Sequence, residues 1–205
     1  MSLRALFATQ VYTAQWRDAR ARSLNSRLLR ECLQLQADDK AGRAWSRRGY
    51  PGGYTSYNSL CRMQQISPTF AALARRIDQH VSRYCLQLEL DLAGRALTMT
   101  DCWVNIMPRG VVHSLHLHPH STISGTYYVQ TPPGSSGLKL EDPRLDRYMA
   151  APPRRANARP EHQSWITVPA AARQLVLFES WLRHEVPPNP SVRQRISISF
   201  NYNWF

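Results

Sequence analysis

The strictest pattern in this chain lies in residues 195–204, where apolar and polar side chains alternate one by one. Successive side chains of a β-strand point to opposite faces, so this segment predicts a strand with two unlike faces. Such a strand lies either at a sheet edge with its polar face in water or beside a cavity that this face lines. A histidine at position 184, shortly before the segment, favours the cavity. The apolar face comprises Ile196, Ile198, Phe200, Tyr202 and Trp204, and the polar face comprises Arg195, Ser197, Ser199, Asn201 and Asn203.

The order of the other expected elements indicates an α+β fold that is mainly β. Apolar residues at helical spacing predict a helix over residues 18–36, and Ser67 followed by Pro68 is typical of a second helix start. A polar, glycine-rich loop is expected between them at 38–60. Short strands are expected at 5–13, 97–107, 122–130, 138–140, 165–168, 174–179 and 194–204.

Two helices followed by six or seven strands predict helices packed outside a β-sandwich or barrel. We expect a single domain over residues 1–205. Its helical portion would cover about 1–94, and its β core about 95–205.

Composition limits the classes of function. The 205 residues carry a net charge of +12, from 24 arginines and two lysines against 14 acidic residues. Because the arginines are scattered, an acidic substrate or partner is expected sooner than nucleic acid. No apolar run approaches the ~20 residues of a membrane span, and the N-terminal residues lack a secretory signal pattern. Four cysteines without C-x-x-C spacing are typical of reduced thiols, so we expect a cytoplasmic protein.

Four of the seven histidines lie between positions 113 and 120. In an extended segment His116 and His118 project to the same side, and His184 from a distant strand would complete a three-point metal site with open coordination positions. That arrangement suits oxygen chemistry at a non-haem iron. Pro119 should end the strand, which places His120 beyond it, and His113 should face away or lie in the preceding turn.

Four ordered blocks of sequence resemble the 2-oxoglutarate- and Fe(II)-dependent oxygenases of bacteria and phage. Residues 116–128 fit H-x-H-P-x-S-x-x-S-G-x-Y-Y, residues 142–144 read D-P-R, residues 181–186 fit W-L-x-H-x-V, and residues 195–201 fit R-x-S-x-S-F-N. Residues 6–12 also resemble that family's opening segment. The resemblance implies a double-stranded β-helix, a jelly roll of the cupin type, that uses Fe(II), O2 and 2-oxoglutarate.

The resemblance also assigns roles to residues. It implies that His116 and His184 are metal ligands, and that Arg195 and Ser197 bind the distal carboxylate of 2-oxoglutarate. The chain departs from the superfamily at His118, where most members carry Asp or Glu. Either His118 is the third ligand, which we favour, or a carboxylate such as Asp142 reaches the metal.

Two further side chains are candidates for the co-substrate site. Asn105 could face the cavity from the strand before the histidine cluster. Either Tyr127 or Tyr128, which point to opposite faces, could offer a hydroxyl to 2-oxoglutarate, and we assign this role to Tyr127.

The resemblance implies a hydroxylase that acts on a small-molecule or peptide substrate and releases succinate and CO2. Desaturation, cyclisation and halogenation remain open, as does the substrate. One alternative is a three-histidine cupin metalloenzyme that does not use 2-oxoglutarate, against which Arg195 and Ser197 argue. The other is a non-enzymatic basic nucleic-acid-binding protein.

Residues 148–163 are rich in proline and arginine and lack hydrophobic periodicity. We expect a mobile loop that closes over the site as a lid, with Arg154, Arg155 and Arg159 on an anionic part of the substrate. The alternative is a surface insertion with no role.

Overall fold

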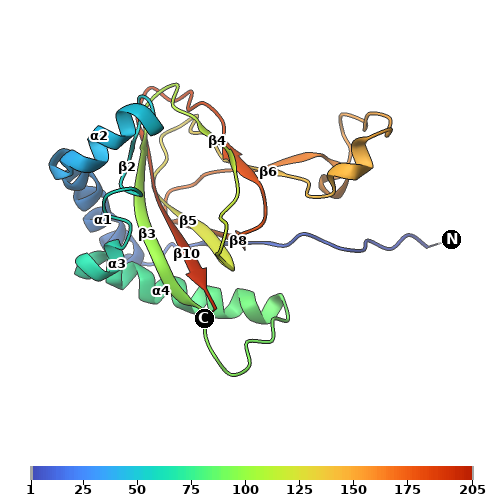
Figure 1. Cartoon of the computed structure of the whole chain (residues 1–205), viewed down its shortest axis with the longest axis horizontal. Coiled ribbons are helices and arrows are strands. Elements are labelled where there is room, and N and C mark those ends of the chain that lie inside the picture. The colour runs from blue at the N-terminus through green and yellow to red at the C-terminus, as the bar shows by residue number, and fades with distance from the viewer. Residues whose placement is uncertain (1, 205) are drawn as a thin grey trace.

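The computed structural model describes residues 2–204, apart from the side chains of Arg147 and Tyr148. Helices lie on one side of a twisted larger sheet, and a smaller sheet lies on its other side (Figure 1). The helices are α1 (Ala19–Asp38), α2 (Lys40–Gly49), α3 (Met63–Ile66) and α4 (Pro68–Gln87), with short 3-10 turns η1 (Leu145–Tyr148) and η2 (Pro160–His162). None of the helices formed by residues 2–204 is both long and apolar enough to span a bilayer.

Side-chain caps explain where the helices begin. The carboxylate of Asp18 accepts from the backbone N–H of Ala21 at the start of α1. Ser67 accepts from the first N–H groups of α4, and Pro68 follows it at a position where no N–H is needed, which confirms the predicted start.

The strands form two antiparallel sheets. The larger sheet has, in spatial order, β1 (Val11–Gln15), β8 (Gln174–Glu179), β5 (Ile123–Gln130), β10 (Arg195–Asn203), β3 (Thr98–Met107) and β2 (Tyr54–Thr55). The smaller sheet has β4 (His113–His116), β9 (His184–Val186), β6 (Leu138–Glu141) and β7 (Trp165–Val168). Two packed antiparallel sheets with flanking N-terminal helices confirm the predicted α+β, mainly β, double-stranded β-helix.

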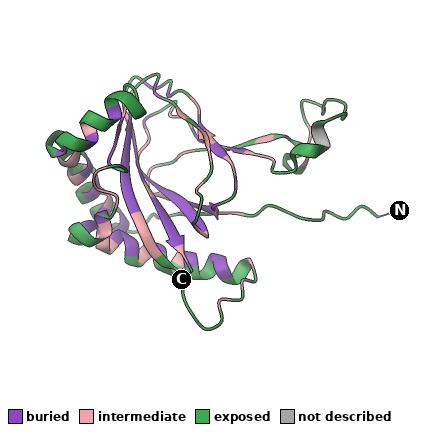
Figure 2. Cartoon of the chain, in the orientation of Figure 1, coloured by how far each residue is buried: buried purple, intermediate pink, exposed green. Residues whose placement is uncertain are grey.

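Strand β10 lies between β5 and β3, so it is not an edge strand. Its apolar face packs with α1 and α4 in the main core, through Ile196, Ile198, Phe200 and Tyr202. Its polar face therefore points between the two sheets, as predicted from the alternation. Figure 2 shows how fully these central strands are buried.

Two sequence predictions are wrong in detail. The expected loop at 38–60 contains α2, a polar helix that begins where Asp39 accepts from the backbone N–H of Gly42. The expected strand at 5–13 begins only at Val11, and residues 2–10 are exposed and outside any strand.

The segment that joins β6 to β7, residues 142–164, extends away from both sheets as an arm that carries η1 and η2 (Figure 1). Nearly all of its described side chains are exposed (Figure 2). The predicted lid, residues 148–163, falls on this arm, and the side chain of Tyr148 lies outside the described residues.

Candidate functional site

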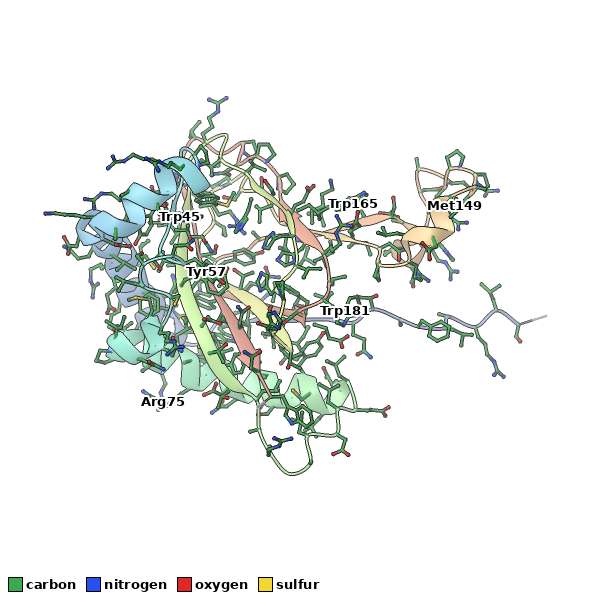
Figure 3. The ribbon with its side chains drawn as sticks, viewed as in Figure 1. Trp45, Tyr57, Arg75, Met149, Trp165 and Trp181 are labelled. Atoms are coloured by element: carbon green, nitrogen blue, oxygen red, sulfur yellow. The ribbon has the colours of Figure 1, made fainter. Side chains whose placement is uncertain are left out.

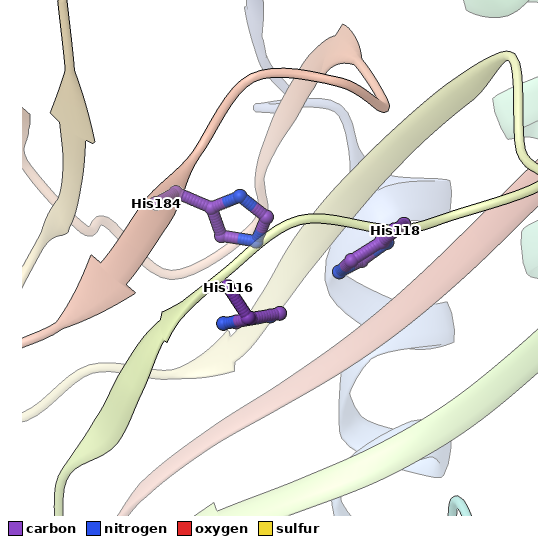
Figure 4. Close-up of side chains that lie close together, drawn as sticks. All are labelled: His116, His118 and His184. Atoms are coloured by element: carbon purple, nitrogen blue, oxygen red, sulfur yellow. The ribbon is translucent and has the colours of Figure 1, made fainter. Parts of the chain in front are cut away.

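The structure brings three histidines together between the sheets (Figure 4). His116 ends β4 and pairs with His184 at the start of β9, so the antiparallel register places the two side by side. His118 follows two residues after β4, where its backbone N–H donates to Ser180 O at 3.0 Å. One ligand atom from each ring lies within 4.8 Å of the others, which is close enough for one metal ion to contact all three.

Hydrogen bonds hold each of the three imidazoles through its Nδ1. His116 Nδ1 lies 2.7 Å from Ser114 O, and His184 Nδ1 lies 2.8 Å from Leu182 O. A carbonyl oxygen only accepts, so in both rings Nδ1 carries the proton and Nε2 offers a lone pair. His118 is held in the same way, with Nδ1 2.7 Å from the side-chain oxygen of Asn201. This partner on the far ring nitrogen is typical of metal-binding histidines.

The environment also keeps these imidazoles neutral. Burial, helped by the nearby His116, lowers the pKa of His118 to about 4, although the hydrogen bond to Asn201 acts in the opposite direction. Burial likewise lowers the pKa of His184 and of His116. Neutral imidazole is the form that binds metal, and three such nitrogens suit Fe(II) among other first-row ions.

Asp142, the alternative third ligand, does not join this group. Its carboxylate pairs with Arg144 at 3.0 Å, at the base of the arm. The described residues therefore offer a donor set of three nitrogens, with His118 where most of the superfamily has a carboxylate.

Arg195 is buried near the three histidines, with only 2% of its surface exposed. Its Nε donates to Ser136 O at 3.1 Å and its Nη1 donates to Ser197 Oγ at 3.2 Å, while the guanidinium lies over the ring of Tyr128. No carboxylate among the described residues pairs with it. A buried charge without a counter-ion is costly, so this arrangement fits a site that receives an anion.

A small inner cavity connects the histidines with Arg195. Its volume is about 40 Å³, and Asn105, Ser197 and Ser199 line it from the polar faces of β3 and β10. Buried polar atoms around it have no hydrogen-bond partner, namely Asn105 Oδ1 and Thr126 Oγ1. The Thr126 hydroxyl can donate, and a free hydroxyl donor near an unpaired cation matches the chemistry of a carboxylate ligand.

The inner cavity is small for 2-oxoglutarate, so side chains must move to admit it. The sulfur of Met107 lies 3.3 Å from Arg195 Nη1 and occupies a donor that a carboxylate could otherwise use. Methionine is flexible and its sulfur is a weak acceptor, so Met107 is the side chain that moves most readily. The cavity also adjoins a larger cleft of about 520 Å³, and both are lined by Trp103, His113, His116 and His118.

Tyr127 does not lie at the inner cavity, which corrects the choice made from sequence. Its ring packs against Trp16 in the core beneath the helices, and its hydroxyl donates to Asn25 Oδ1 of α1 at 3.1 Å. Because neighbouring strand residues face opposite ways, Tyr128 takes the inner face. Its hydroxyl is buried without a hydrogen-bond partner, and its ring lies under the Arg195 guanidinium.

His113 was expected to face away from the cluster or to lie in the preceding turn, and both expectations are wrong, because His113 begins β4. Its ring stacks on that of His116 with centroids 4.5 Å apart, and it lines both the inner cavity and the cleft. An irregularity in the register between His113 and His116 turns both rings to one side. Burial, with His116, His118 and Arg195 nearby, lowers the pKa of His113 to about 3.

The structure does not bring the arm's arginines to the site. Arg154, Arg155 and Arg159 are all exposed on the arm, and none of them lines the inner cavity or the cleft. In this conformation the segment is not a lid. The expectation of an anionic substrate depended on these three arginines, so the structure gives it no support.

Residues 101–201 match a family model described as "Putative 2OG-Fe(II) oxygenase". This match confirms the resemblance drawn from the sequence motifs, and with it an oxygenase that depends on Fe(II) and 2-oxoglutarate. It disfavours both alternatives, the three-histidine enzyme without 2-oxoglutarate and the nucleic-acid-binding protein. No curated protein sequence matches the chain.

Solved structures with the same fold include three of interest, all too distant in sequence to show more than the fold. A prolyl-4-hydroxylase from Pseudomonas putida is 18% identical, with 95% of this chain and 92% of that chain covered and a TM-score of 0.63. The epimerase SnoN, in complex with Fe3+, alpha ketoglutarate and nogalamycin RO, is 16% identical over 95% and 79% of the two chains, with a TM-score of 0.65. A prolyl hydroxylase from Trichoplax adhaerens, bound to a hypoxia inducible factor peptide fragment, is 17% identical over 94% and 83%, with a TM-score of 0.62.

Proposed function

We propose that this chain, a member of the 2OG-Fe(II) oxygenase family, hydroxylates a small-molecule or peptide substrate as a single oxygenase domain. Bound Fe(II) and 2-oxoglutarate supply the oxidising chemistry with O2, and succinate and CO2 are released. The observation that carries the proposal is the pairing of three neutral, Nδ1-anchored imidazoles with a buried arginine that has no carboxylate partner among the described residues.

In this proposal His116, His118 and His184 hold the metal through Nε2. Their Nδ1 partners keep the rings in place and fix the tautomer. The histidines enter from β4, the segment after it and β9, so the metal is held where the two sheets meet.

Arg195 binds the distal carboxylate of 2-oxoglutarate, and Ser197 donates to the same group. The hydrogen bond between Arg195 and Ser197 holds the two donors 3.2 Å apart on one strand face. Asn105 lines the inner cavity between this carboxylate and the metal. The hydroxyl of Tyr128, which has no hydrogen-bond partner, would donate to the bound co-substrate.

The substrate class is proposed as small molecule or peptide because one solved structure of this fold is in complex with nogalamycin RO and another with a peptide fragment. We also propose a cytoplasmic location, which rests on four cysteines that are all free.

A turnover assay tests the proposed function. Purified protein with Fe(II), O2 and 2-oxoglutarate should form succinate even without a substrate, at a slow uncoupled rate. His184→Ala should abolish this activity, whereas His162→Ala, on the arm, should not. Succinate formation that needs no iron, or that survives His184→Ala, would rule the proposal out.

A further inference from the structure

The cleft beside the three histidines has walls from two parts of the chain. One wall comes from α2 and residues 49–58, and the other from residues 110–119, which lead into and out of β4. Its volume of about 520 Å³ lies within the range of ~300–1,000 Å³ that is usual for small-molecule sites. Since it opens directly onto His116 and His118, a molecule held here would be presented to the metal.

The chemistry of this cleft is unlike that of the rest of the surface. In a chain with 26 basic and 14 acidic residues, no Lys, Arg, Asp or Glu whose side chain the structure describes lines it. A charged substrate group placed here would lose its hydration and gain no partner, so the cleft disfavours ions of either sign.

Large apolar side chains gather at the mouth of the cleft and remain partly open to solvent. Trp45 is 41% exposed and Tyr57 is 46% exposed on one wall, and Val112 and Leu117 are similarly exposed on the other. Figure 3 shows Trp45 and Tyr57 beside α2 and β2. Exposed apolar side chains that face each other across a cleft are typical of a ligand site rather than of ordinary surface.

Trp45 is placed by the glycine one helical turn after it. A Cβ at position 49 would collide with the six-membered ring of the Trp45 indole, so Gly49 lets that ring lie along the end of α2. The colliding atoms are at the far end of a side chain that can turn, so Gly49→Ala should displace the ring and spare the backbone.

A continuous line of rings leads from the mouth to the metal site. Tyr57 meets Trp103 edge to face with centroids 4.8 Å apart, and Trp103 lies 6.0 Å from the ring of His118. Aromatic faces of this kind hold flat or cyclic apolar groups by stacking.

We propose that this cleft, which we name the aromatic cleft, binds an uncharged, mainly apolar small molecule with a ring system. The molecule would lie between Trp45 and Tyr57 on one wall and Val112 and Leu117 on the other. The inference rests on the proposed function, because it makes this molecule the substrate that is oxidised. It replaces the anionic substrate expected from the chain's positive charge.

Two fluorescent probes of nearly equal shape test the charge preference. N-phenyl-1-naphthylamine is uncharged, and 1-anilinonaphthalene-8-sulfonate is the same scaffold with a sulfonate. The neutral probe should bind saturably, and Trp45→Ala, Tyr57→Ala and Gly49→Ala should each weaken it about tenfold. The sulfonate probe should bind to the aromatic cleft at least tenfold more weakly than the neutral probe does. Its binding there is the part that Trp45→Ala removes.

Trp181→Ala is the matched control, because Trp181 is also 46% exposed but lies apart from Trp45 and Tyr57 (Figure 3). It should leave the neutral probe's affinity within twofold. Circular dichroism of every variant should match the wild type.

Three results would overturn the proposal. These are no saturable binding of the neutral probe, binding that the Trp45 and Tyr57 variants leave within twofold, and Trp45-dependent binding of the sulfonate that is as tight as that of the neutral probe. Displacement of the probe by a capped, uncharged alanine peptide but not by 1-naphthol would point to a polypeptide and overturn it as well. Binding of iron and 2-oxoglutarate to the wild type is measured separately. This measurement tests the proposed function, and its result does not depend on the result with the fluorescent probes.

Discussion

The ring nitrogen Nδ1 of His118 lies 2.7 Å from the side-chain oxygen of Asn201, although 83 positions separate them in the chain. Asn201 belongs to the polar face of β10, the same face that carries Arg195 and Ser197. One strand therefore both anchors a proposed metal ligand and supplies the proposed carboxylate site.

Asn201→Ala should weaken Fe(II) binding about 10- to 100-fold, because His118 Nδ1 loses its amide acceptor and keeps only the hydroxyl of Ser124 at 2.8 Å. Asn201→Asp keeps an acceptor at the same place and should restore most of the affinity. Asn203→Ala, two residues along the same strand, is the control. Anaerobic Fe(II) titration measures all three, and wild-type affinity in Asn201→Ala would contradict a positioning role.

His118→Ala should lower bound iron at least tenfold, because a metal held by three imidazoles loses one of them. His118→Asp should retain iron, since the carboxylate recreates the commoner donor set of two histidines and an acid. His120→Ala is the control, as His120 is exposed on the turn that follows. Elemental analysis of bound iron tests whether His118 is a metal ligand. Full iron occupancy in His118→Ala would contradict this role and would favour Asp142 or another carboxylate as the third ligand.

Arg195→Met should weaken 2-oxoglutarate binding by about 2–5 kcal/mol, or roughly thirtyfold to several thousandfold, while iron still binds. Without 2-oxoglutarate the variant should unfold at a temperature equal to or above that of the wild type, because a buried unpaired charge has been removed. Arg193→Ala, exposed two residues earlier, should change neither property. Calorimetric titration measures the affinity for 2-oxoglutarate, and thermal melts with and without it measure the unfolding temperature. If 2-oxoglutarate stabilised the wild type and Arg195→Met equally, Arg195 would not be its binding residue.

Asp39 should make stability depend on pH in the acid range. Burial alone raises the pKa of its carboxyl, but hydrogen bonds from Ser59, Gly42 and Tyr54 outweigh this and leave the pKa below its usual value. A lowered pKa in the folded state adds stability above the unfolded-state value of about 4, and that stability is lost as the pH falls below it.

Asp39→Asn should therefore cost about 1.5–3 kcal/mol at pH 7, since hydrogen bonds to a charged acceptor are lost. The gap between variant and wild type should narrow as the pH falls below 4. Asp38→Asn, on the exposed neighbouring residue, should stay within about 0.5 kcal/mol of the wild type. Urea unfolding at pH 7 and pH 3.5 measures both, and a gap that is the same at the two pH values would show that the charge of Asp39 contributes nothing.

The sequence was sufficient for the parts of the site that follow from strand periodicity. The alternation in residues 195–204 correctly separated the core face of β10 from its cavity face, because one face packs on helices and the other cannot. The pair His116 and His118 with distant His184 followed from spacing and motif, and the structure places all three together.

The other parts of the site and fold could not be predicted, because they depend on features that residue spacing does not indicate. A register irregularity turned His113 toward the cluster, and nothing in the sequence marks it. The alternation of side chains along a strand shows that Tyr127 and Tyr128 face opposite ways, but it does not show which of them faces inward. Helix α2 was not predicted because its residues are mostly polar and show no apolar pattern. It is stabilised by hydrogen bonds from Tyr54 and Ser59 to its cap residue Asp39, and these residues come together only in the folded chain.

The central claim is that one site binds Fe(II) and 2-oxoglutarate together, and an anaerobic titration followed by visible absorbance tests it most directly. Protein loaded with one equivalent of Fe(II) should develop a charge-transfer band that saturates near one equivalent of 2-oxoglutarate. The band should be absent in His184→Ala and should need far more 2-oxoglutarate in Arg195→Met. Iron-loaded wild-type protein that develops no band at any 2-oxoglutarate concentration would contradict the claim.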